Sequence, residues 1–393
     1  MIAHLFQNSY NFFPEIHDFH EPGNTGTEKD VGTLEQFVCG TRIISGAGVV
    51  SALGTLGAKR ALVVTDPFFY ENGAAEHVAK ATGAETWEIF HQVAPDPGIE
   101  LAAEGTAVVR KLAPDLIVAL GGGSAMDCAK AMKYFSGTNA RFAAIPTTSG
   151  SGSEVTDFSI ITHGGVKHPL VDAVLRPDVA ILDSDFLQQL PKGLIADSGF
   201  DILAHALEAY VARDAGAITD ALAQDAFCAA FSKLPASYVG DQSVRLDIHK
   251  AATMAGMAFT QAGLGLCHAM AHSLGGTFHV PHGRLNAILL PEVIRYNAAA
   301  AGEKYAKIGR MAGFGGSVET IAQRNLINAL ARLRRELGLP ETLVQAGVDP
   351  REVRQKSGEI VTAALADPCC ATNPVKPEAA GVRELLERVT GHG

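Results

Sequence analysis

Hydrophobic residues follow two different patterns along the chain, and the change falls near Pro191. Before it, short apolar runs rich in Val, Ile and Leu alternate with longer stretches of helical spacing. Such runs, bounded by turn residues, predict buried strands, and their alternation with helices predicts a mainly parallel sheet covered on both faces. The predicted strands are residues 37–40, 60–65, 85–90, 115–120, 142–146, 159–162 and 179–182.

The second half of the chain has the 3.6-residue period of amphipathic helices. The predicted helices are residues 197–212, 217–233, 247–260, 266–275, 282–298, 302–312, 318–336 and 350–366. We therefore predict an N-terminal extension (residues 1–35), an α/β dinucleotide-binding domain (residues 36–190) and an all-α C-terminal domain (residues 191–393).

The first 35 residues differ from the rest. Five apolar residues fall at roughly helical spacing and are followed by a polar linker at residues 23–27. This segment either docks on a partner or shell protein or packs against its own subunit. The apolar residues are Ile2, Leu5, Phe6, Tyr10 and Phe13.

Composition narrows the class of protein. A chain of 393 residues with 47% hydrophobic and 19% charged residues can bury two sizeable cores. The net charge of −10 argues against nucleic acid or an anionic membrane as partner. Six cysteines without a CxxC spacing, together with the lack of a signal peptide or membrane-spanning apolar run, predict a reduced, cytoplasmic protein.

Two loops are candidates for binding a nucleotide. Residues 121–127 follow a predicted strand with three glycines, and residues 147–153 follow the next strand with five hydroxyl side chains. Glycines and a helix N-terminus favour phosphate, although the first loop could also be only a tight turn. Asp66 either caps a helix or accepts from an adenosine ribose hydroxyl, which would favour NAD over NADP.

Four of the fourteen histidines lie within fifteen residues of each other. His268 and His272 are at i and i+4, so a helix presents both on one face. We expect Gly275 and Gly276 to end that helix and a second helix to begin near His282. His279 could lie behind the site or on the surface, and each histidine taken alone could be structural.

A second pair, Asp201 and His205, is also spaced i, i+4. Combined with His268 and His282, it supplies one carboxylate and three imidazoles, a set suited to Fe²⁺ or Zn²⁺. His272 is then left as a candidate proton carrier beside the metal.

Taken together, these motifs resemble the iron-dependent (group III) alcohol dehydrogenases, from about residue 37 to the C-terminus, and most closely the 1-propanol dehydrogenase subgroup. The resemblance implies a dehydroquinate-synthase-like architecture with the metal and substrate between the two domains. It also implies NAD(H), a homodimer or larger oligomer, and a small alcohol or aldehyde as substrate. Some members with such an extension are housed in bacterial microcompartments, so residues 1–35 could direct this chain there.

The resemblance also assigns roles to individual residues. Asp201, His205, His268 and His282 would be the metal ligands, His272 would pass a proton to solvent, and Phe158 would line the substrate pocket. The residues at NAD would be Asp66, Gly122, Gly123, Ser124, Asp127, Thr147, Thr148 and Lys167.

Arg284 departs from the subgroup, in which an apolar residue follows the His-Gly pair. It could meet an anionic aldehyde such as sulfoacetaldehyde, or form a structural ion pair. Two other classes stay open: a dehydroquinate-synthase-like lyase, which would need more basic residues than Arg284 near the metal, and a non-catalytic NAD or metal sensor, which would not need a complete site.

Overall fold

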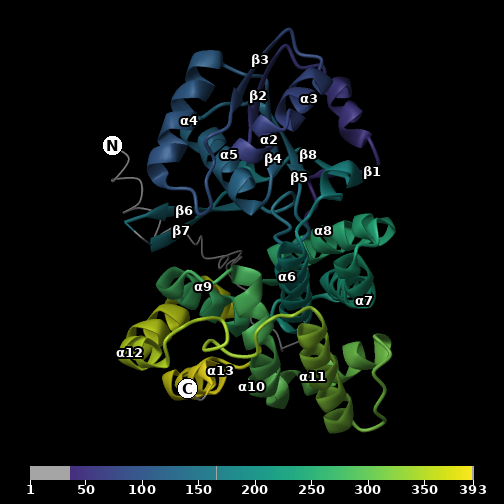
Figure 1. The fold of residues 1–393 in the computed structure, drawn as a ribbon, viewed down its shortest axis with the longest axis vertical. Helices are drawn as coiled ribbons and strands as arrows, with labels where there is room; N and C mark the ends of the chain where they lie inside the picture. Colours follow the sequence, from purple (N-terminus) through teal and green to yellow (C-terminus); the bar gives the residue numbers. More distant parts are fainter. Residues whose placement is uncertain (1–35, 165, 392–393) are drawn as a thin grey trace, which may run out of the picture. The chain divides into compact units, whose positions relative to one another are not determined.

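The computed structural model describes residues 36–164 and 166–391 (Figure 1). The residues from Phe37 onward belong to one compact unit. The predictions for residues 1–35 fall outside the described part of the chain.

A six-stranded sheet forms the first part of this unit, with strand order β1-β8-β5-β4-β2-β3 and every pairing parallel. One core packs its face against α4 (Ile99–Leu112) and α5 (Gly123–Ser136), and another packs the opposite face against η1 (Val49–Leu56) and α3 (Ala74–Ala81). The predicted doubly covered parallel sheet is confirmed. The strands are β1 (Arg42–Gly46), β2 (Arg60–Val64), β3 (Thr86–Phe90), β4 (Leu116–Gly121), β5 (Arg141–Pro146) and β8 (Val179–Asp183).

One strand prediction was wrong, and a second predicted strand lies outside the main sheet. Residues 37–40 are not a strand; pairing begins later, where the Arg42 N–H donates to the Asp178 carbonyl at 2.9 Å. Residues 159–162 do form a strand, β6 (Phe158–His163), but it pairs antiparallel with β7 (Val166–Val171) in a separate hairpin. The hairpin lies below the main sheet in Figure 1.

Helices form the second part, with α6 at its centre (Figure 1). From Gly199 to Val211 every residue of α6 is buried, and its neighbours include α7, α8 and α10. No helix in the described ranges is long and apolar enough to cross a membrane. The helices are α6 (Lys192–Val211), α7 (Ala217–Val239), α8 (Arg245–Ala262), α9 (Leu266–Phe278), α10 (His282–Met311), α11 (Glu319–Glu336), α12 (Pro350–Ala366) and α13 (Ala379–Thr390).

Three predicted helix boundaries were wrong. α9 passes through Gly275 and Gly276 and ends instead at His279, whose φ of 56° is left-handed and whose N–H bonds to the Gly275 carbonyl at 2.9 Å. Residues 282–298 and 302–312, predicted as two helices, form one helix, α10, in which Gly302 is a point of close packing. A Cβ at Gly302 would lie only 2.2 Å from the Glu319 side chain of α11.

Candidate functional site

Three helices bring one carboxylate and three imidazoles together. Asp201 and His205 lie one turn apart on α6, His268 is in the first turn of α9, and His282 begins α10. The Asp201 Oδ1 is 3.4 Å from His282 Nε2, 3.7 Å from His268 Nε2 and 3.9 Å from His205 Nδ1. The three histidines that the sequence predicted as metal ligands therefore surround Asp201 Oδ1, and the ligand atoms of Asp201, His205 and His268 all lie within 4.8 Å of one another.

Burial and the repulsion between the histidines keep His205 and His282 neutral, while Asp201 stays ionised. These are the forms that bind a cation. Burial lowers the pKa of His205 to about 3 and the pKa of His282 well below its ordinary value. Burial acts to raise the pKa of Asp201, but the neighbouring histidines outweigh it and hold that pKa below its usual range. An ionised carboxylate beside neutral imidazoles is the donor set of Fe²⁺ and Zn²⁺ sites, so these residues fit such an ion.

Glu208, which the sequence analysis missed, fixes the orientation of His268. Its buried carboxylate accepts from His268 Nδ1 at 2.6 Å and from the N–H groups of Cys267 at 2.7 Å and His268 at 3.2 Å. Because Nδ1 donates to this carboxylate, Nε2 is the nitrogen left for an ion. Burial opposes protonation of His268, yet hydrogen bonds to Asp201 and Glu208 raise its pKa to about 9.

Asn286 is a second missed residue. It is fully buried one turn along α10 from His282. Its Nδ2 lies 2.8 Å from Asp201 Oδ1, 3.2 Å from His282 Nε2 and 3.4 Å from His268 Nε2. The amide has two hydrogens to donate, and its shortest contact is the one to the Asp201 carboxylate.

His272 lies beside this group and not within it. Its ring stacks on His282, with centroids 5.2 Å apart and an interplanar angle of 14°. Its Nδ1 pairs with Asp367 Oδ2 at 2.8 Å, a partner that the sequence analysis missed. Burial acts to raise the pKa of Asp367, but the hydrogen bond to His272 outweighs it and lowers the pKa to about 2.

The two predicted nucleotide loops lie next to each other at the carboxyl end of the sheet. Gly122 is the N-cap of α5 without a side-chain cap, so the helix N-terminus offers free N–H groups. A Cβ at Gly122 would lie 3.2 Å from Thr148 Oγ1, and one at Gly121 would lie 3.7 Å from Asp66 Oδ2. Asp66 also caps α2 (Pro67–Glu71) by accepting from the Phe69 N–H at 3.1 Å, as the capping alternative predicted.

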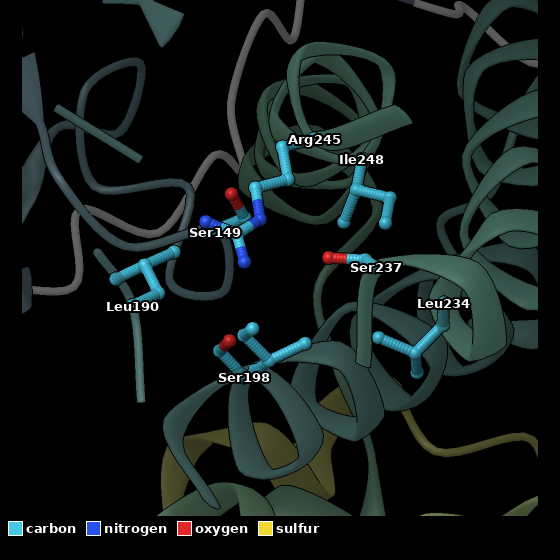
Figure 2. A pocket seen from close by; sticks show the side chains of 8 residues that line it. Ser149, Leu190, Ser198, Leu234, Ser237, Arg245 and Ile248 are labelled. Atoms are coloured by element: carbon cyan, nitrogen blue, oxygen red, sulfur yellow. The ribbon is translucent and has the colours of Figure 1, made fainter. Parts of the chain in front are cut away.

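The second loop, residues 147–153, also reaches the side chain of Asp201. A Cβ at Gly150 would lie 3.3 Å from Asp201 Oδ2 and 3.0 Å from the Ser198 side chain. The neighbouring Ser149 lines a cavity of about 10 Å³ with Ser198 and Arg245 (Figure 2). This cavity has room for about one water molecule, so it is not a substrate pocket.

The remaining predicted residues lie around these two groups. Phe158 begins β6, and its ring lies 6.0 Å from that of Phe259, which stacks at 4.4 Å on His205. Phe259 therefore contacts both the predicted pocket residue, Phe158, and the imidazole of His205. The sequence analysis gave no signal for it, because it is one of many apolar residues in α8.

Three predicted residues carry charge. Lys167 Nζ donates to Asp96 Oδ1 at 2.7 Å. Burial raises the pKa of the Asp127 carboxyl group to about 7, although the positive charges of Lys130 and Lys167 act to lower that pKa. Arg284 donates through Nε and an Nη to the two oxygens of Asp197, at 3.2 and 3.0 Å, so its charge is already paired.

Comparison with known proteins agrees with this geometry. Residues 40–184 match the profile described as iron-containing alcohol dehydrogenase, and residues 195–390 match that of the Fe-containing alcohol dehydrogenase family, C-terminal. The 1-propanol dehydrogenase PduQ of Salmonella typhimurium is 40% identical, covering 91% of this chain and 100% of that protein. The NADPH-dependent butanol dehydrogenase of Clostridium saccharobutylicum is 36% identical, covering 91% and 98%.

A solved structure shows the same fold. The iron-containing alcohol dehydrogenase of Thermococcus thioreducens superposes with a TM-score of 0.83 at 35% identity, covering 90% of this chain and 99% of that one.

Proposed function

Because this chain belongs to the iron-containing alcohol dehydrogenase family, we propose that it interconverts a short-chain primary alcohol and its aldehyde with NAD(H) and a divalent metal ion. The observation that carries this proposal is that the loop of residues 147–153 meets the predicted metal ligands at Gly150, which lies against Asp201. The hydroxyl-rich loop after β5 lies against Asp201, so a nucleotide on that loop would face the carboxylate and the imidazoles.

In this proposal Asp201, His205, His268 and His282 hold Fe²⁺, with Zn²⁺ as the alternative ion. When bound, such an ion supplies Lewis acidity toward the alcohol or carbonyl oxygen. Glu208 keeps the Nε2 of His268 directed at it. Asn286 orients the Asp201 carboxylate through the 2.8 Å hydrogen bond.

NAD(H) would bind along the carboxyl end of the sheet. The free N–H groups at Gly122, Gly123 and Ser124 would hold the pyrophosphate, and the Thr147 and Thr148 hydroxyls would add donors. Asp66 and Lys167 would bind the two riboses. In this proposal the nucleotide contacts all come from residues 36–190, the nucleotide domain. The metal ligands all come from residues 191–393, the metal domain.

His272 would move the proton of the alcohol between the site and solvent. Its ring lies against His282, its Nδ1 is held by Asp367, and its side chain is 34% exposed. An imidazole in this position can accept a proton on the site side and release one on the solvent side.

We propose a neutral substrate such as propanal, reduced to the alcohol. The pairing of Arg284 with Asp197 supports this choice over a sulfonated or carboxylated aldehyde, because a neutralised guanidinium attracts an anion weakly. Because Arg284 is paired and is the one Lys or Arg in residues 268–284, this stretch has no unpaired lysine or arginine, which disfavours the lyase alternative. The link of residues 1–35 to a microcompartment stays a prediction.

The test is a turnover assay. The purified protein is loaded anaerobically with Fe²⁺, and NADH absorbance is followed with propanal, butanal and a sulfonated aldehyde at equal concentration. We expect turnover of the neutral aldehydes and little of the sulfonated one. If metal-loaded protein turns over none of them, the proposed function is wrong.

A further inference from the structure

A second group of metal-binding side chains lies beside the first and has no part in holding the proposed catalytic ion. His272, Asp367 and Cys369 each offer one ligand atom, and these atoms all lie within 4.8 Å of one another. His272 comes from α9, Asp367 follows α12 as the N-cap of η5 (Pro368–Thr372), and Cys369 lies in η5. The three residues are partly exposed, so a cation from solvent can reach them.

The geometry of the turn fixes two of the three ligands. Asp367 is the N-cap of η5 and accepts from the Cys369 N–H at 2.9 Å, which holds the carboxylate and the Cys369 residue together. Its other oxygen pairs with His272 Nδ1 at 2.8 Å. The folded protein therefore already holds the Asp367 carboxylate in place between His272 and Cys369.

We propose that His272, Asp367 and Cys369 form a second, inhibitory site for Zn²⁺. A thiolate, an imidazole nitrogen and a carboxylate oxygen are three ligand types that zinc takes together, with water in the fourth position. The first group lacks sulfur, and a thiolate favours zinc over a harder ion. The two groups therefore differ in the ion they prefer.

Binding redistributes protons in a definite way. The Cys369 S–H releases one proton to solvent, and Zn²⁺ takes its place on sulfur. A His272 ring that carries one proton moves it from Nδ1 to Nε2, and Asp367 stays ionised. The net change is one zinc ion bound and one proton released.

The inhibition rests on the proposed function of His272, whereas the binding itself does not. A ring that relays a proton must accept at one nitrogen and release at the other. Zinc on Nδ1 occupies one of the two, so the relay is interrupted. Zinc should therefore slow turnover without displacing the catalytic ion.

Cys370 provides a matched control. It is the adjacent cysteine and is also partly exposed, but its Sγ lies 3.1 Å from the Ala364 carbonyl and it is not among the three ligands. Cys370→Ser makes the same change of atom as Cys369→Ser. Asp367→Asn is a further test, because Asn can still cap η5 but removes the ionised ligand.

The experiment uses Co²⁺ as a spectroscopic probe on protein already loaded with its catalytic ion. A thiolate on Co²⁺ gives a near-ultraviolet charge-transfer band that the sulfur-free group cannot produce. We expect the band in the wild type and in Cys370→Ser, its loss in Cys369→Ser, and its displacement by Zn²⁺. This readout needs no turnover, so it decides the site even if the proposed function fails.

Zinc inhibition of aldehyde reduction is then measured on the same proteins. Cys369→Ser and Asp367→Asn each remove a proposed ligand, so they should raise the inhibitory zinc concentration by more than about tenfold, the lower end of what losing only a partner of a metal ligand costs. Cys370→Ser should match the wild type. A wild type without the band, a band that survives in Cys369→Ser, or equal zinc inhibition in wild type and Cys369→Ser would each overturn the proposal.

Discussion

His268 donates to Glu208 twice, from its ring Nδ1 at 2.6 Å and from its backbone N–H at 3.2 Å. One carboxylate thus holds both the start of α9 and the tautomer of a proposed metal ligand. Because the pair is buried, neither group can exchange this partner for water.

Replacing this carboxylate should weaken metal binding. In Glu208→Gln the amide NH₂ faces N–H donors, so His268 loses its fixed orientation. We expect metal affinity to fall by about 10- to 100-fold, measured by competition with a chelator. The control is Glu384→Gln, an exposed pair with Arg388. Equal affinity in all three proteins would refute the role of Glu208.

Replacing either of two neighbouring histidines should lower activity, but only one replacement should remove the metal. His268→Ala removes a proposed ligand, so we expect loss of both metal and activity. His272→Ala keeps the four ligands, so it should retain metal and lose about 10²-fold or more in kcat, as removal of a general acid–base group does. Metal content by elemental analysis separates the two, and loss of metal from His272→Ala would place that ring among the ligands instead.

Asp66 should set the choice of nucleotide. Its carboxylate can accept from a ribose hydroxyl and repels a 2′-phosphate, so we expect a preference for NADH. Asp66→Ser keeps a helix cap and should reduce the ratio of kcat/KM for NADH over NADPH by about tenfold, or 1.4 kcal/mol.

The control for this substitution is Asp349→Ser, which changes another capping aspartate, at the start of α12. It should leave the nucleotide ratio unchanged. The butanol dehydrogenase of Clostridium saccharobutylicum is named as NADPH-dependent. If the wild-type protein also preferred NADPH, the prediction would be wrong.

His249 should make stability depend on pH. Burial lowers its pKa from 6.5 to about 4, and its Nδ1 pairs with Ser149 Oγ at 2.9 Å. Between pH 6.5 and 4 the unfolded chain binds a proton that the folded protein does not. The free energy of unfolding should therefore fall on acidification through this window, by up to about 3 kcal/mol.

Urea unfolding of the wild type and His249→Gln from pH 7 to pH 4 checks this prediction. The variant should lose less stability on acidification than the wild type. His77→Gln, the same change at an exposed position on α3, should follow the wild-type curve. Parallel curves for all three proteins would show that His249 does not titrate as its burial requires.

The sequence by itself determined the features that depend on local spacing. Short apolar runs predicted the parallel sheet and the 3.6-residue period predicted most helices. An i, i+4 spacing put Asp201 and His205 on one face of α6, since a helix always brings such residues together. Motif order was enough to recognise the family.

Only the tertiary structure decided the partners that are distant along the chain. Glu208 and His268 are 60 residues apart, Asp197 and Arg284 are 87, and His272 and Asp367 are 95. No periodicity records which helices pack together, so none of these pairs could be predicted. The same packing places Gly302 against α11 and leaves Arg284 paired with Asp197, because side chains on separate helices meet only when the core between them is formed.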